Sequence, residues 1–198
     1  LGIVLLSAPI VQAALMQDDR SLLEKVRQVL AQLDVHDAVL AFKAIVRAAP
    51  GGLGEAETHD VYDMPDITLL QAMQSAEERD HIAWQYSHGF ENVFGLGCDA
   101  YHQAMARWNN PAWATTVLYL TFLSRFPDSH VRRKYGLDMA QVVSSQAATH
   151  LEALLTHENP KLYQRTLLDF DMELKGRGLN PGTSADLTVA TLLAQALW

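Results

Sequence analysis

The sequence lacks several features that mark particular classes of protein. It has one cysteine, Cys98, so it can form neither an internal disulfide nor a cluster of thiolate metal ligands, which suits a reducing, cytoplasmic compartment. Its 15 basic residues are outnumbered by 23 acidic ones, and the net charge of -8 excludes a broad positive surface for nucleic acid. No segment alternates apolar and polar residues between hairpin turns, as strands would. These absences favour an all-α protein whose anion sites are local.

Long apolar runs are also missing. The opening stretch LGIVLLSAPIVQAALM holds about 16 mostly apolar residues, fewer than the roughly 20 that cross a bilayer. No basic residues precede its apolar run, as they would in a signal peptide. We therefore expect no membrane partner, and we interpret the stretch as a buried core helix of a chain whose native N-terminal segment is missing.

What is present is the three-and-four spacing of apolar residues that is typical of amphipathic helices. Residues 1–198 predict a single domain, a multi-helix bundle of about eight or nine helices. Asp34 is expected to cap one helix, Asp66 or Thr68 to cap a longer one, and Pro111 to open another. The predicted helices cover residues 1–16, 19–33, 35–48, 66–94, 99–108, 111–126, 137–156, 160–175 and 184–197.

A Pro-Gly turn opens the last predicted helix, in the segment from Asn180 to Asp186. Thr183 or Ser184 is a suitable N-cap, and Asp186 would complete a capping box with Asp in place of Glu. A turn and a capped helix need no ligand. Unpaired amides and hydroxyls at a helix N-terminus also bind phosphate, and Gly182 would let an anion come close. Both interpretations stay open.

A glycine-rich loop follows the helix that is expected to end near residue 48. Its glycines would permit close approach of the backbone to a ligand, and the acidic residues beyond them could hold Mg²⁺ together with phosphate oxygens. The loop matches neither the dinucleotide-binding fingerprint nor the P-loop, so a plain helix stop with a solvated acidic loop is the alternative. The candidates are Gly51, Gly52 and Gly54 for the ligand, and Asp60 and Asp63 for the metal.

The densest basic cluster of this acidic chain lies between Asp128 and Gly136. Asp128 or Ser129 could cap a short helix there. That helix would present Arg133 and Lys134 to a phosphate, Arg133 as a bidentate donor and Lys134 as a point charge. A capped helix with solvated cations is the alternative.

Histidines next to acidic residues give a further hypothesis. The pairs His36-Asp37 and His59-Asp60 are typical of HD-like metal-dependent phosphohydrolases, which are also all-helical. His81, on the predicted long helix, is interpreted as a structural residue. A non-catalytic helical nucleotide-binding module is the third alternative.

Several of these segments match, in order, the motifs of one known family. The most specific is NPGTSADLTVATLL, residues 180–193, which is similar to a Pro-Gly-x-Ser-Ala-Asp-Leu signature. Residues 54–56 resemble a Gly-Glu-Ala element, residues 128–136 a segment with Asp-Ser/Thr followed by Arg and Gly, and residues 1–9 the helix after a short polar element. From end to end the chain resembles the triphosphoribosyl-dephospho-CoA synthase family, although the polar element and an upstream Pro-Lys-Pro-Gly segment are not in the sequence.

The resemblance implies a transferase. Members of that family move the 5-triphosphoribosyl group of ATP to the 2′-hydroxyl of 3′-dephospho-CoA and release adenine. The product is the precursor of a prosthetic group carried by acyl carrier proteins. ATP and dephospho-CoA would be the substrates, Mg²⁺ the expected cofactor and an acyl carrier protein a downstream partner, and a homo-oligomer is compatible with this function.

The candidate residues fit the tasks of that reaction. Loss of adenine develops positive charge on the ribose, which a nearby carboxylate would stabilise, and the acceptor hydroxyl needs a base. The triphosphate needs amides, cations and Mg²⁺. The resemblance thus implies Asp186 and Asp128 at the ribose, Glu55, Asp60 or His130 as the base, and Asn180, Gly182, Thr183, Ser184, Arg133 and Lys134 around the triphosphate, with the glycine-rich loop nearby.

Overall fold

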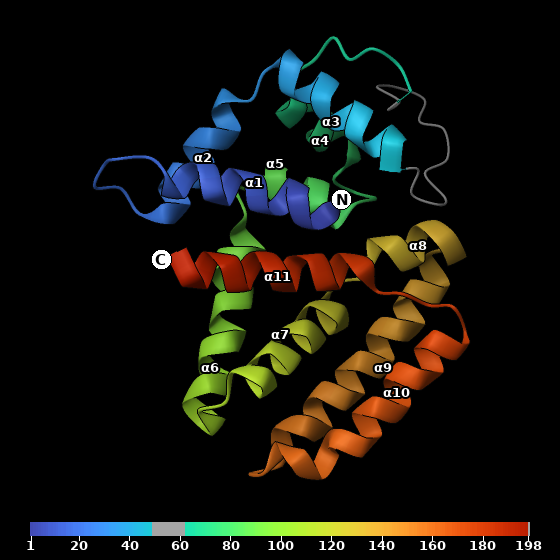
Figure 1. The fold of residues 1–198 in the computed structure, drawn as a ribbon. Coiled ribbons are helices and arrows are strands. Elements are labelled where there is room, and N and C mark those ends of the chain that lie inside the picture. Colours follow the sequence, from blue (N-terminus) through green and yellow to red (C-terminus); the bar gives the residue numbers. More distant parts are fainter. Residues whose placement is uncertain (49–61, 198) are drawn as a thin grey trace. The chain divides into compact units, whose positions relative to one another are not determined.

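The computed structural model describes residues 1–48 and 62–197 (Figure 1). All regular elements within these ranges are helical, which confirms the all-α prediction. They comprise eleven α-helices, a π-helical turn and a 3₁₀ turn, which is more than the eight or nine helices expected. The additional helices arise because the long helix expected between residues 66 and 94 is broken, and because a short helix forms after Asp128.

The chain divides into two compact units, Leu1–Phe94 with Val189–Trp198 (unit 1) and Gly95–Thr188 (unit 2). Unit 1 contains α1 (Gly2–Ala14), α2 (Leu22–Gln32), α3 (Val35–Ala48), α4 (Leu69–Ala76) and α5 (His81–Ser87). Unit 2 contains α6 (Cys98–Trp108), α7 (Pro111–Arg125), α8 (Ser129–Tyr135), α9 (Leu137–Thr156), the 3₁₀ turn η2 (Pro160–Tyr163) and α10 (Gln164–Gly176). The last helix, α11 (Gly182–Leu197), begins in unit 2, and its residues from Val189 onward belong to unit 1. The single domain expected from the sequence stays a prediction.

Helix α1 buries one face and exposes the other. Leu6 and Ile10 are fully buried, whereas Leu15, just after the helix, is 68% exposed. The helix packs against α2 and α5, and the Tyr86 hydroxyl donates a hydrogen bond to the Leu5 carbonyl oxygen at 2.6 Å. The expected core helix is therefore buried on one side only. Within the described ranges, no helix combines the length and the apolar character needed to cross a membrane.

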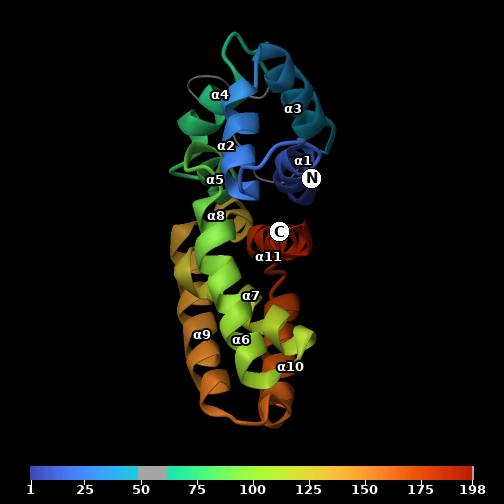
Figure 2. The same cartoon turned by 90° about the vertical axis from the view of Figure 1, so that its left-hand side faces the viewer.

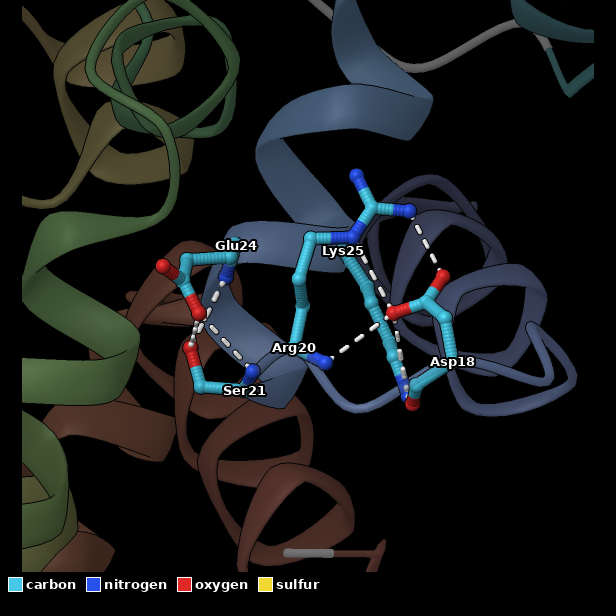
Figure 3. A network of polar contacts seen from close by, with 5 residues as sticks. All are labelled: Asp18, Arg20, Ser21, Glu24 and Lys25. Atoms are coloured by element: carbon cyan, nitrogen blue, oxygen red, sulfur yellow. Dashed lines mark hydrogen bonds and ion pairs between the residues drawn. The ribbon is translucent and has the colours of Figure 1, made fainter.

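The turn between α1 and α2 is held by a polar network (Figure 3). The Ser21 hydroxyl accepts a hydrogen bond from the Glu24 amide, and the Glu24 carboxylate accepts one from the Ser21 amide. The Lys25 ammonium donates to the Asp18 carbonyl oxygen at 2.6 Å. A side-chain hydrogen bond from Arg20 lowers the pKa of Asp18 to about 2. Because Ser21 and Glu24 form a capping box, α2 begins at residue 22 rather than at residue 19.

Helix α3 has the bounds predicted for it, because Asp34 caps it as expected. The Asp34 carboxylate accepts from the Asp37 amide at 3.0 Å, and the Asp37 carboxylate accepts from the Asp34 amide at 2.9 Å. Asp37 therefore takes part in capping the helix, and its neighbour His36 is exposed. This arrangement accounts for the His36-Asp37 pair without a metal.

The expected helix from residue 66 to residue 94 is wrong because polar and left-handed residues interrupt it. Thr68 and Gln71 form the predicted start, a capping box for α4. Asp80 then starts a new helix, since its carboxylate accepts from the amides of residues 82 and 83. Gly89 and Phe90 end α5 with φ angles of 58° and 61°. A π-helical turn, η1 (Val93–Gly97), leads into α6.

A partly buried polar cluster lies around α5. The side-chain amides of Gln85 and Asn92 both approach Nε2 of His81 at 3.2 Å. Gln85 is fully buried. The rings of His81, Trp84 and His88 are stacked, with centroids 5.1 and 4.0 Å apart. Burial, together with nearby His88, lowers the pKa of His81 to about 4.

Unit 2 is built around α7 and α9, which pack against each other, with α6 on α7 and α8 on α9 (Figure 2). Asn109 ends α6 in the left-handed conformation, and Asn110 caps α7. The thiol of Cys98 is buried. The core includes Ala114, Leu120, Leu123, Val131, Val143, Ala147, Leu154, Phe170 and Leu174. This framework positions the short helix α8.

Candidate active site

Asp128, one of the two candidate caps in the sequence, starts α8. Its Oδ1 accepts hydrogen bonds from the amides of His130 and Val131 at 2.9 and 3.1 Å. The helix is short, so Arg133 and Lys134 lie in its last turn. His130 lies one turn before both, at the three-and-four spacing that places side chains on one face of a helix.

Helix α11 begins at Gly182, two residues earlier than expected. Thr183 and Ser184 therefore lie in its first turn, and the prediction that either is the N-cap is wrong. The acceptor comes instead from another helix, because Oδ2 of Asp128 accepts from the Ser184 amide and from the Ser184 hydroxyl, each at 2.8 Å. A carboxylate 56 residues away in the sequence thus supplies the hydrogen-bond acceptor that was expected from a local N-cap side chain.

Residues 128–136 and 178–184, which we call the paired motifs, lie antiparallel and side by side within unit 2 (Figures 1 and 2). At one end Asp128 binds Ser184. At the other end the Tyr135 hydroxyl donates to the Gly178 carbonyl oxygen at 2.8 Å. The structure thus joins two segments that the sequence identifies separately.

In the middle of the paired motifs, His130 lies against Gly182. A Cβ atom added at Gly182 would come within 2.6 Å of Nδ1 of His130. Real Cβ contacts are essentially never that short, so only glycine fits there without movement of the imidazole. The φ angle of Gly182 is not positive, and the requirement for glycine is one of space.

Charge in the paired motifs is divided between a buried anion and the cations of α8, of which Arg133 is half-buried and Lys134 is exposed. Asp128 and Ser184 are each 2% exposed. Burial, and after it the nearby carboxylates of Asp128 and Asp171, raise the pKa of Tyr119. Lys134 is exposed, with its ammonium 5.1 Å from the Tyr135 ring centroid.

The remaining predicted site residues are not part of the paired motifs. Gly51, Gly52, Gly54, Glu55 and Asp60 lie outside the described residues, as does His59. Asp63 belongs to unit 1 and is exposed. In the part of the chain that the structure describes, no three His, Cys, Asp or Glu side chains gather to hold a metal ion.

Two residues of the paired motifs were missed by the sequence analysis. Tyr135 and Gly178 join the far ends of the two segments. Gly178 has a φ of 69° and follows closely on α10, and a glycine just past a helix end is a signal that could have drawn attention to this turn. Tyr135 carries no comparable local signal.

Comparison with known proteins decides the family. The family model for ATP:dephospho-CoA triphosphoribosyl transferase matches residues 1–198. The chain belongs to this family. The resemblance in the sequence is thereby confirmed, and the protein is a transferase of the triphosphoribosyl group of ATP to dephospho-CoA. The phosphohydrolase and the non-catalytic module are set aside.

The fold of the family agrees with that of the chain. A crystal structure from Archaeoglobus fulgidus, of a protein described as a candidate triphosphoribosyl-dephospho-CoA synthase, superposes with a TM-score of 0.72. The two share 24% sequence identity, and the match covers 98% of this chain and 81% of that one. Among curated proteins none matches this chain significantly.

Proposed function

We propose that the paired motifs hold the triphosphate of ATP. The observation that carries the proposal is the antiparallel contact, which brings the basic helix α8 to the first turn of α11. Arg133 and Lys134 supply cations, and the N-terminus of a 16-residue helix supplies a positive dipole end. The chain is acidic overall, so this local basic patch is where an anion is best accommodated.

Two backbone amides in the first turn of α11 already donate within the protein. We therefore propose that cations, rather than these amides, bind most of the triphosphate. The Gly182 amide donates to the Asn180 carbonyl oxygen at 2.8 Å, and the Ser184 amide donates to Asp128. Both donors are therefore used within the protein. The positive charge of the proposed site therefore comes from Arg133 and Lys134 of α8.

Asp186 is our candidate for the carboxylate beside the ribose. It is half-buried and lies four residues after Gly182, so the two share one face of α11. A carboxylate there would stabilise the positive charge that develops as the bond to adenine breaks. His130, which contacts that face at Gly182, would accept the proton of the acceptor hydroxyl as the 2′-oxygen attacks ribose C1.

We further propose that Mg²⁺ accompanies the triphosphate. Asp60 and Asp63 stay its predicted protein ligands, since carboxylate oxygen is the donor that Mg²⁺ prefers. Bound Mg²⁺ would neutralise phosphate charge. A cytoplasmic location, a downstream acyl carrier protein and a homo-oligomer stay predictions.

Removing the two cations tests the proposed triphosphate site. Arg133→Ala and Lys134→Ala should each raise KM for ATP about 10-fold, since each removes a charge-assisted contact. The matched controls Arg165→Ala and Lys175→Ala remove cations from exposed ion pairs on α10, and should leave KM unchanged. The assay is chromatography of adenine released from ATP in the presence of dephospho-CoA and Mg²⁺. Equal effects from both sets of variants would refute the site, and absence of adenine with the wild type would refute the activity.

Adding one methyl group tests the contact in the middle of the paired motifs. Gly182→Ala should lower kcat/KM for adenine release by at least about 10-fold, because the new Cβ displaces the His130 ring from its position. The melting temperature should change little, since an imidazole can rotate away. Gly176→Ala on α10 is the control, because its Cβ would meet nothing within 4 Å and activity should not change. Similar activity of both variants would show that His130 need not lie against Gly182.

A further inference from the structure

We propose that Asp128 is a positioning residue that acts through Ser184 and His130, and that it does not itself contact the ribose. The inference rests on the proposed function and revises the expectation that Asp128 is a second catalytic carboxylate. It also changes the task of Ser184, from a ligand of the triphosphate to the partner of Asp128.

The carboxylate of Asp128 is already saturated. Its Oδ1 accepts from the amides of His130 and Val131, and its Oδ2 accepts from the amide and the hydroxyl of Ser184. An ionised carboxylate offers about four acceptor positions, and all of them are used. Asp128 is also 2% exposed. A group so placed has neither the capacity nor the access to stabilise a sugar cation directly.

The hydrogen-bond donors of Ser184 are likewise already used within the protein. Its amide and its hydroxyl both donate to one oxygen of Asp128, and Ser184 is itself 2% exposed. A hydroxyl has one proton to donate, so this bond prevents Ser184 from donating to a phosphate oxygen. The two side chains form a buried clasp between the first turns of α8 and α11.

The clasp sets the positions of residues that do face the substrate. On one side it holds the His130 amide, and with it the ring that contacts Gly182. On the other side it holds the turn of α11 that begins at Gly182 and carries Asp186. Opening the clasp should therefore displace His130 and Asp186 relative to each other, although neither is changed.

A double-mutant cycle distinguishes positioning from direct catalysis. Asp128→Asn keeps the size of the side chain and an oxygen for the α8 amides, but turns an NH₂ group toward the Ser184 amide. Ser184→Ala removes the hydroxyl alone. The cycle uses both single variants and the double variant of the full chain. KM for ATP, kcat for adenine release and the melting temperature are measured for each.

We expect Ser184→Ala and Asp128→Asn each to raise KM for ATP by about 10-fold or more. The double variant should be no worse than Asp128→Asn alone, because both changes open the same clasp. If Asp128 instead contacts the ribose, Asp128→Asn should reduce kcat at unchanged KM, Ser184→Ala should resemble the wild type, and the effects should multiply. That result would overturn the proposal.

Two controls separate the clasp from loss of stability and from failure of the triphosphate site. Asn110→Ala removes a cap with the same pair of amide contacts from α7, and should lower the melting temperature without changing KM. If Asp128→Asn does not fold, Ser184→Ala decides alone, since a wild-type KM would refute the clasp. A normal KM in Arg133→Ala would refute the triphosphate site while leaving coupling between Asp128 and Ser184 intact.

Discussion

Replacing Asp128 with alanine is expected to lower the free energy of unfolding by about 4 kcal/mol. The change removes the acceptor of three amides and one hydroxyl, all at a residue that is 2% exposed. Donors left buried without a partner lose their hydration and gain nothing in return. Urea denaturation, followed by circular dichroism, measures the change directly.

Loss of an ordinary helix cap provides the comparison for that result. Asn110→Ala should cost about 1 kcal/mol, since Asn110 caps only its own helix. The difference between the two variants measures what Asp128 contributes by joining two helices. If Asp128→Ala costs no more than Asn110→Ala, the bond to Ser184 contributes nothing to stability.

Acidification should destabilise the chain through His81. The pKa of His81 is lowered from 6.5 to about 4 in the folded protein, first by burial and then by His88. Between these two values the unfolded chain binds a proton that the folded chain does not. Stability is therefore complete above about pH 6.5 and falls as the pH is lowered toward 4, by about 3 kcal/mol from this residue.

The geometry at His81 explains why protonation is resisted and suggests the test. Nε2 faces the amide donors of Gln85 and Asn92, so a proton there would meet two further donors. His81→Gln retains an acceptor for both amides but cannot titrate. Urea denaturation at pH 7 and at pH 4.5 should show a smaller loss for the variant than for the wild type. Parallel losses would show that His81 does not control acid sensitivity.

Local chemistry predicted those elements whose ends are set by their own residues. Asp34 and Pro111 mark helix starts that the structure places at the expected positions, because capping and the fixed φ of proline act within one turn. The helix expected from residue 66 to residue 94 failed where apolar spacing continued across Asp80 and Gly89. The Asp80 carboxylate caps a new helix, and the spacing of apolar residues alone gives no sign of that cap.

The candidate site could be predicted in parts but not as an assembly. Residues 128–136 and 180–186 contain recognisable caps, cations and a Pro-Gly turn. Their contact joins residues 56 positions apart, and no feature of either segment alone specifies it. For the same reason the cap of α11 was assigned to Thr183 or Ser184, although the acceptor is Asp128.

The two glycines of the paired motifs differ in how their loss could be repaired. Gly178 has a φ of 69°, which glycine adopts readily but which would strain the backbone of any residue with a Cβ, and no second mutation elsewhere relieves that strain. Gly182 is required only because His130 occupies the space of its missing side chain. A second mutation can therefore relieve the crowding at one position but not the strain at the other. A smaller residue at position 130 would make room for the new Cβ of Gly182→Ala, but it would also remove the imidazole, so the double variant would stay catalytically impaired.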